Sequence, residues 1–195
     1  NFFQSIYYFY CSVNVYQPKI FYFFPFCCRI YFIINSGSFE LALRKYPKKI
    51  IGKKAVIRKL EPKDLAQSLA WLKDPQVNKF LSQDFSGFDL KQENQWYQFI
   101  QSSHNDMAFA IDTQTGKYIG NCSMHKIKLS KKIGEFGIVI GDKQYWNQGY
   151  GTDAVKLVLQ YATHDLGLRK IELNVYNYNG RAIKTYLKCG FKHKE

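Results

Sequence analysis

Residues 135–154 constrain the fold more than any other stretch, because they predict a strand, a turn and a helix in direct succession. The apolar, β-branched run from Ile138 to Ile140 is typical of a buried strand. Gly149 and Gly151 lie in the turn that follows. Apolar residues then recur at helical spacing, at Val155, Val158, Leu159, Ala162 and Leu166. The first N–H groups of a helix have no partner within it, and glycines let a ligand approach that backbone. The stretch therefore predicts a site for an anion, most often a phosphate.

Two glycines before a helix are a weak signal when taken alone. Only Gly149 and Gly151 match the spacing of a dinucleotide-binding fingerprint, and no Gly-Lys-Ser or Gly-Lys-Thr follows to make a P-loop. A turn that merely packs the helix against the strand would use the same glycines. Both interpretations stay open on this stretch alone.

A second stretch, closer to the C-terminus, makes the pattern more specific. The first motif reads Trp146-Asn147-Gln148-Gly149-Tyr150-Gly151-Thr152. The second reads Asn179-x-Arg181-Ala182-Ile183-x-x-Tyr186-x-Lys188-x-Gly190-Phe191. Together they resemble the GCN5-related N-acetyltransferases (GNAT), and within them the branch of the ribosomal-protein-alanine and spermidine acetyltransferases. The resemblance covers residues 53–195, and Trp146 departs from the Arg or Gln that begins the family's first motif.

The order of the expected elements predicts an α/β (α+β) fold. The expected strands are 55–60, 107–111, 117–128, 133–140 and 170–175, and helices are expected from Pro62, Asp89, Gly149 and Arg181. An antiparallel meander that leads into a β-α-β unit gives a mixed, mostly antiparallel central sheet with helices on both faces. The resemblance implies that the strands 133–140 and 170–175 splay apart and that acetyl-CoA enters the gap between them.

The helix that follows Asp89 carries the clearest local signals. Asp89 and Gln92 have the spacing of a capping box, in which each side chain bonds the other residue's backbone N–H. We expect the apolar side of this helix to hold Trp96, Phe99 and Ile100.

The chain divides into three parts by composition. Residues 1–40 form an aromatic-rich leader, residues 41–52 a basic linker, and residues 53–195 the N-acetyltransferase domain. Three interpretations of the leader stay open: a segment foreign to the native protein, a membrane anchor and a packed extension. Pro25 and Arg29 would both be costly in a spanning helix. The sequence stops at Glu195, where the family usually adds one more strand, so we expect the domain to be truncated there.

The charge and the cysteines narrow the partners. A formal net charge of +13 suits an anionic cofactor and nucleic acid equally well. Lys and Arg are dispersed and no nucleic-acid motif is present, so we expect no nucleic-acid partner. The cysteines show neither CxxC pairs nor zinc spacing, which predicts a reduced, cytoplasmic protein without a metal. Four scattered histidines are expected at surface or loop positions, namely His104, His125, His164 and His193.

The resemblance implies an N-acetyltransferase with acetyl-CoA as co-substrate. The pyrophosphate would bind the backbone N–H groups of Gln148, Gly149, Tyr150, Gly151 and Thr152. The pantetheine amides would pair with the exposed backbone of Ile138, Val139 and Ile140, in the manner of an added strand.

Four side chains are candidates for the chemistry, and each has a structural alternative. Glu135 is the expected general base, directly or through water, or else a solvated edge carboxylate. By resemblance, Asn179 contacts the pantetheine arm and Tyr186 protonates the departing thiolate. Their alternatives are a helix N-cap and a packed core aromatic. Arg181 is either a phosphate contact or a surface charge.

The acceptor is expected to be a primary amine of a protein N-terminus or of a small molecule, attacking the thioester directly. The loops 73–88 and 126–132 would select it, and their basic and aromatic character argues against polyamines. A non-catalytic acyl-CoA-binding module is the alternative function. Membrane contact is expected only through the leader, and a homodimer is compatible with the sequence.

Overall fold

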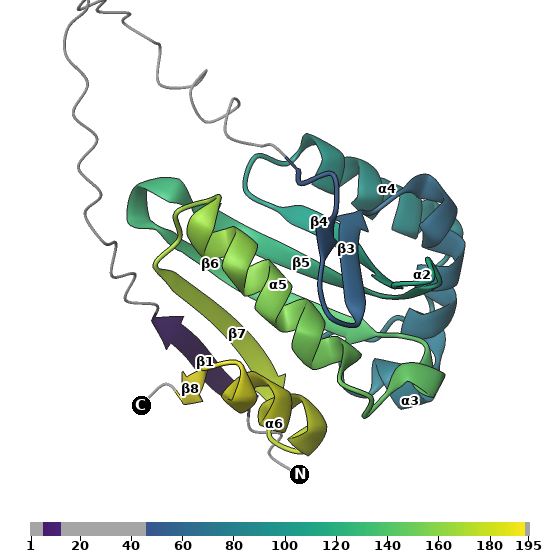
Figure 1. The fold of residues 1–195 in the computed structure, drawn as a ribbon. Coiled ribbons are helices and arrows are strands. Elements are labelled where there is room, and N and C mark those ends of the chain that lie inside the picture. Colours follow the sequence, from purple (N-terminus) through teal and green to yellow (C-terminus); the bar gives the residue numbers. More distant parts are fainter. Residues whose placement is uncertain (1–5, 13–45, 194–195) are drawn as a thin grey trace, which may run out of the picture.

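The structure, a computed structural model, describes residues 6–12 and 46–193, and for residues 6–12 the backbone alone. Eight strands of this part form one sheet in the order β2-β3-β4-β5-β6-β7-β1-β8 (Figure 1). The strands are β1 (Ile6–Ser12), β2 (Ile50–Ile51), β3 (Ala55–Lys59), β4 (Met107–Thr113), β5 (Tyr118–Lys128), β6 (Ile133–Ile140), β7 (Lys170–Tyr176) and β8 (Lys192–His193). The α-helices are α2 (Leu65–Lys73), α3 (Pro75–Asn78), α4 (Leu90–Ser102), α5 (Tyr150–His164) and α6 (Gly180–Lys188).

Side-chain alternation along β4 shows that helices cover both faces of the sheet. Met107, Phe109 and Ile111 belong to a large core cluster that α5 completes. Ala108 and Ala110 point the other way and pack with residues of α2 and α4. Figure 1 shows α5 in front of the sheet, with α2 and α4 beyond β3 and β4. The predicted mixed sheet with helices on both faces is therefore confirmed.

The sheet is antiparallel at every pairing except that of β6 with β7. These two parallel strands pair only from Ile133 to Glu135 on β6 and from Lys170 to Glu172 on β7. The rest of each strand runs on without the other, so the predicted splay begins directly after Glu135 and Glu172. This is the switch point at which open α/β sheets bind ligands.

β1 lies inside the expected leader and is part of the sheet. It pairs antiparallel with the whole of β7, from Ile6 opposite Tyr176 to Ser12 opposite Lys170. On its other side it pairs with the two-residue strand β8. The expected linker 41–52 contributes β2. The remainder of the leader, with Cys27 and Cys28, lies outside the described residues, and its origin stays a prediction.

A buried ion network joins β3, β4 and the start of α2. The Arg58 guanidinium donates to Asp64 at 2.7 and 2.9 Å and to Asp112 at 2.7 and 3.1 Å. Asp64 also accepts the backbone N–H of Glu61 at 2.9 Å, which fixes the turn before α2. All three charged side chains are nearly buried. The network therefore ties the helical layer to the sheet at the end of β3.

The predicted capping box before α4 is confirmed, because Asp89 and Gln92 exchange hydrogen bonds at 2.8 and 2.9 Å. The predicted apolar side is only partly right. Ile100 is buried and Trp96 packs beside it, but Phe99 is 59% exposed. Phe99 precedes Ile100 by one position, a step of about 100° around the helix, so both cannot face the core equally.

Candidate functional site

A cleft of about 820 Å³ opens where β6 and β7 separate. Its walls come from β6, β7, α6, the start of α5 and the segment around α3. Nearly all of the residues predicted to form the site line it, namely Glu135, Ile138, Val139, Ile140, Gly149, Gly151, Thr152, Asn179, Arg181 and Tyr186. The two stretches that suggested the family thus meet across one cavity of a size usual for ligand sites.

The start of α5 forms one end of this cleft. Gly149 is the N-cap residue in the left-handed region, with φ +88°, and no side chain caps the helix. In the described part of the chain, no group accepts a hydrogen bond from the backbone N–H of Gly151 or Thr152. Uncapped N–H groups that face a cavity suit an anion. The predicted phosphate loop therefore has the geometry to hold a pyrophosphate.

Gln148 and Tyr150, the other two predicted residues of this loop, do not line the cleft. The Gln148 carbonyl accepts a hydrogen bond from Lys54 Nζ at 2.7 Å, and the Tyr150 ring packs edge-on against Tyr145. Asp153, in the first turn of α5, accepts the backbone N–H groups of Lys54 and Ala55 at 2.8 and 2.9 Å. The start of β3 thus braces the phosphate loop from behind. Sequence reasoning missed Lys54, because the contact joins segments far apart in the chain.

Substitution of Gly151 should separate cofactor binding from folding. A Cβ at Gly151 would meet only Ile140 Cγ1 at 3.6 Å, an ordinary contact, whereas any side chain at Gly149 would be strained by its positive φ. We expect Gly151→Val to weaken acetyl-CoA binding at least about tenfold, or 1.4 kcal/mol, because the branched side chain crowds the backbone approach. Calorimetric titration of the folded variant measures this. Gly87→Val, at a loop position with open space, is the matched control. Unchanged affinity in Gly151→Val would contradict the phosphate-loop assignment.

The middle of the cleft follows the free edge of β6. Ile138, Val139 and Ile140 line the cavity beyond the last residue that pairs with β7. The Ile140 carbonyl accepts a hydrogen bond from Trp146 Nε1 at 2.6 Å, which holds the indole against the end of the strand. The Ile140 carbonyl is thus already occupied, but the edge from Gly137 to Val139 lies beyond the pairing with β7 and is open to the amide pairing predicted for a pantetheine arm.

Arg181 lies between two aromatic rings at the rim. Its guanidinium carbon is 3.6 Å from the centre of the Trp146 ring and 5.7 Å from that of Phe80. Burial lowers the pKa of Arg181 below its ordinary value, and no carboxylate in residues 46–193 forms an ion pair with it. The neighbouring Tyr178 hydroxyl donates to the Lys79 carbonyl at 2.7 Å. These contacts attach the α3 segment to the start of α6 and leave a cation without an acidic partner at the cleft.

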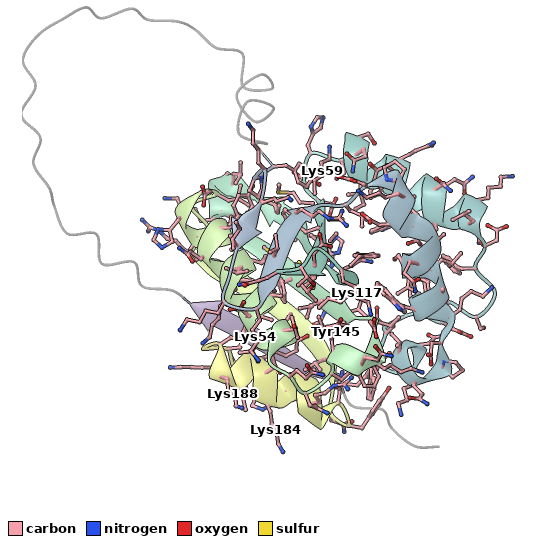
Figure 2. All side chains as sticks on the ribbon, turned by 45° about the vertical axis from the view of Figure 1, so that its right-hand side comes forward. Lys54, Lys59, Lys117, Tyr145, Lys184 and Lys188 are labelled. Atoms are coloured by element: carbon pink, nitrogen blue, oxygen red, sulfur yellow. The ribbon has the colours of Figure 1, made fainter. Side chains whose placement is uncertain are left out.

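Further positive charge lies along α6. Lys184 and Lys188 also line the cleft, and Figure 2 shows both projecting from α6, on the side of the molecule where Lys54 also lies. Among the described residues that line the cleft, Glu135 is the single carboxylate. The charge of the cavity wall therefore suits an anionic ligand at the α5–α6 end.

Glu135 lies at the point where the two strands part. It is the last residue of β6 that pairs with β7, and it points to the face opposite Phe136, a residue of the α5-side core. Both carboxylate oxygens are 3.0 Å from Lys126 Nζ. Glu135 is thus a partly exposed carboxylate in the cleft that is already ion-paired.

Asn179 and Tyr186 come from the two ends of α6. Asn179 is the N-cap residue, and its Oδ1 accepts the backbone N–H of Ala182 at 3.2 Å. Tyr186 is 6% exposed and packs against Phe191, with ring centres 5.7 Å apart. Burial, with a smaller effect from Cys189, raises the pKa of Tyr186 above its ordinary value. Both structural alternatives are therefore present in the fold, and both residues still reach the cleft.

No helix in residues 46–193 combines the length and apolar character needed to cross a bilayer. No group of three or more His, Cys, Asp or Glu side chains in that part could bind a metal ion. Neither Cys122 nor Cys189 forms a disulfide there.

This chain is similar to known proteins in sequence and in fold. A family model described as an acetyltransferase (GNAT) domain matches residues 54–192. An uncharacterized N-acetyltransferase, p20 of Bacillus licheniformis, is 26% identical over 145 residues, which are 70% of this chain and 78% of that protein. An uncharacterized protein of Methanocaldococcus jannaschii is 25% identical over 164 residues, 82% of this chain, and the chain spans only 33% of its length.

Solved structures agree on the fold. The spermidine N-acetyltransferase of Vibrio cholerae, crystallised with CoA and spermine, gives a TM-score of 0.68 at 20% identity over 72% of this chain and 82% of that one. A domain from Methanocaldococcus jannaschii gives a TM-score of 0.63 at 25% identity over 74% and 92%. Because the family model spans most of the chain, the chain belongs to the GNAT acetyltransferase family, and residues 54–192 form its acyltransferase domain.

Proposed function

We propose that this protein transfers the acetyl group of acetyl-CoA to a primary amine, on a protein N-terminus or a small molecule, by direct attack on the thioester. One observation carries the proposal. The cleft has an uncapped helix start at one end and a carboxylate at the point where β6 and β7 part. An anionic carrier and a basic group for an amine are thereby brought into one cavity.

Acetyl-CoA supplies an activated acetyl group, and the residues of the chain bind and orient it. The backbone N–H groups of Gly151 and Thr152 bind pyrophosphate, and the free edge of β6 pairs with the arm. Glu135 attracts the acceptor ammonium and promotes its deprotonation, directly or through water. The Tyr186 hydroxyl donates a hydrogen bond to the departing sulfur. The N–C bond forms and the C–S bond breaks. The nitrogen then loses its second proton and the thiolate gains one, so that the products are an amide, a thiol and the one proton taken by the base.

The charge around Glu135 favours an acceptor with a single amine. A polyamine would need several carboxylates, whereas Glu135 is the one carboxylate among the described residues that line the cleft, and it is already paired with Lys126. Phe80 and Leu81 provide apolar surface on the α3 side. We therefore favour an amine beside an apolar group, such as a peptide N-terminus, although a neighbour of this fold was crystallised with spermine.

An acceptor panel tests the function. Acetyl-CoA is incubated with the full chain and with N-terminal peptides, simple monoamines, an aminoglycoside or spermidine, while released thiol is followed and the product is checked by mass spectrometry. We expect turnover with at least one monoamine or peptide and little with spermidine. Tight binding of acetyl-CoA without transfer to any amine would instead identify an acyl-CoA-binding module.

A further inference from the structure

A histidine lies directly beside the carboxylate at the centre of the cleft. His125 on β5 is the residue opposite Glu135 on β6, so the two side chains lie on the same face of the sheet. Both line the cleft. His125 was expected only as one of four scattered surface or loop histidines, because the pairing of β5 with β6 cannot be read from its neighbours in sequence.

A second carboxylate orients this histidine. Its Nδ1 lies 3.3 Å from Oδ1 of Asp106, in the loop before β4. Burial opposes ionisation of Asp106, but hydrogen bonds from Ser103 and Lys126 and the nearby His125 hold the pKa of Asp106 below its ordinary value. An ionised carboxylate can only accept hydrogen bonds, so Nδ1 of His125 must carry a proton. The neutral ring then has its lone pair on Nε2.

One irregularity in β5 organises both carboxylates. The register between β5 and β6 shifts between His125 and Lys128, and Lys126 adopts a positive φ of 49°. Its backbone N–H donates to Asp106 Oδ1 at 3.1 Å, while its Nζ binds both oxygens of Glu135. Such bulges often redirect side chains next to active sites. Here the bulge holds Asp106 behind the imidazole and Lys126 on Glu135.

The charged groups around His125 distinguish its role from that of Glu135. They are Asp106 before β4, Lys126 on β5, Glu135 on β6, and Glu172 on β7, which pairs with Lys170 at 2.8 Å. Both oxygens of Glu135 already lie 3.0 Å from Lys126 Nζ. In residues 46–193, no group hydrogen-bonds to Nε2 of His125. This nitrogen can therefore accept a proton directly.

We propose that His125 takes the proton from the acceptor ammonium, with Asp106 as its positioning residue and Glu135 as the group that holds the ammonium. The inference rests on the proposed acetyl transfer and refines the role of Glu135 in it. The proton passes from the ammonium nitrogen to Nε2, giving an imidazolium that Asp106 stabilises. The neutral amine then attacks the thioester carbon.

The tautomer of His125 tests the proposal without any turnover. The full chain is labelled with ¹⁵N-histidine and studied by long-range ¹H–¹⁵N correlation NMR, with His125→Gln used to assign the signal. We expect a neutral ring protonated on Nδ1, and a loss of this preference in Asp106→Asn. A ring protonated on Nε2 in the parent would overturn the proposal, because that nitrogen could not accept a proton.

The kinetics give a second, independent test. In His125→Gln we expect kcat/KM for the amine to fall about 10²- to 10⁴-fold near neutral pH, as is usual for loss of a general base. The loss should shrink at alkaline pH, where more of the amine is already neutral, and the KM for acetyl-CoA should stay within about twofold. His164→Gln, at an exposed position on α5, is the matched control. An unchanged pH–rate profile in His125→Gln would refute the proposal, whereas absence of turnover in the parent would refute the proposed function and leave the NMR test to judge His125.

Discussion

Replacing Tyr186 with Phe should lower kcat by about 10²–10³-fold, because one positioned donor to the leaving group is lost. The ring and its contact with Phe191 remain, so the buried surface of the core is kept. A CoA thiol resembles a free cysteine, with a pKa near 8.5. Burial raises the pKa of Tyr186 above its ordinary value, so the hydroxyl stays protonated over the working pH range. Full transfer of its proton to sulfur is uphill, and we expect the hydroxyl to act by hydrogen-bonding to the developing thiolate.

Single-turnover and steady-state assays with acetyl-CoA measure this effect. Affinity for acetyl-CoA should stay within about threefold of the parent, since the hydroxyl contributes mainly in the transition state. Tyr161→Phe is the matched control, because Tyr161 is also buried, at 4% exposure, but does not line the cleft. A Tyr186→Phe protein with the kcat of the parent would show that the hydroxyl is structural and that water protonates the thiolate.

Replacing Arg58 with Met should lower the free energy of unfolding by about 3–5 kcal/mol, a large part of the stability of a typical domain. Asp64 and Asp112 would remain nearly buried without their shared cation. An uncompensated buried charge costs far more than the loss of an exposed ion pair. Urea unfolding followed by circular dichroism measures the change, and an unaltered m-value would show that the unfolded state is unaffected.

Lys63→Met provides the comparison for Arg58. Lys63 pairs with Glu61 at 2.6 Å, but the two side chains are 71% and 46% exposed, so we expect a change below about 1 kcal/mol. Arg58→Met should also lower the rate of acetyl transfer to the amine acceptor. Asp64 fixes the turn before α2, and α2 leads into the segment that carries Phe80. Equal, small effects in the two variants would mean that Asp64 and Asp112 find other partners.

The parts of the fold set by short-range pattern could be predicted from the sequence. Apolar periodicity located β6 and α5, and the spacing of Asp89 and Gln92 located the start of α4. Glycine chemistry located the turn that begins α5, where Gly149 has the positive φ that few other residues adopt readily. These features depend on residues within a few positions of one another, so a single sequence contains them.

The contacts that join distant segments could not be predicted in this way. The brace from Lys54 to Gln148, the stacking of Arg181 on Trp146 and the orientation of His125 by Asp106 all depend on how strands and helices pack. The irregularity at Lys126 has no signature in composition, because a lysine rarely adopts a positive φ. Glu135 was found through the family resemblance, but its ion pair with Lys126 was not.

The position of β1 affects how the sheet is assembled during synthesis. β1 precedes its two partners, β7 and β8, by most of the length of the domain, so it is translated long before them. Pairings between segments so far apart close a long loop and form slowly, in contrast to the local hairpin of β4 and β5. On the ribosome, the outer edge of β7 therefore stays open until β1 docks, and an open edge can pair with a strand of another nascent chain. β7 is also one wall of the cleft, so the docking of β1 is the folding step that completes the support of that wall.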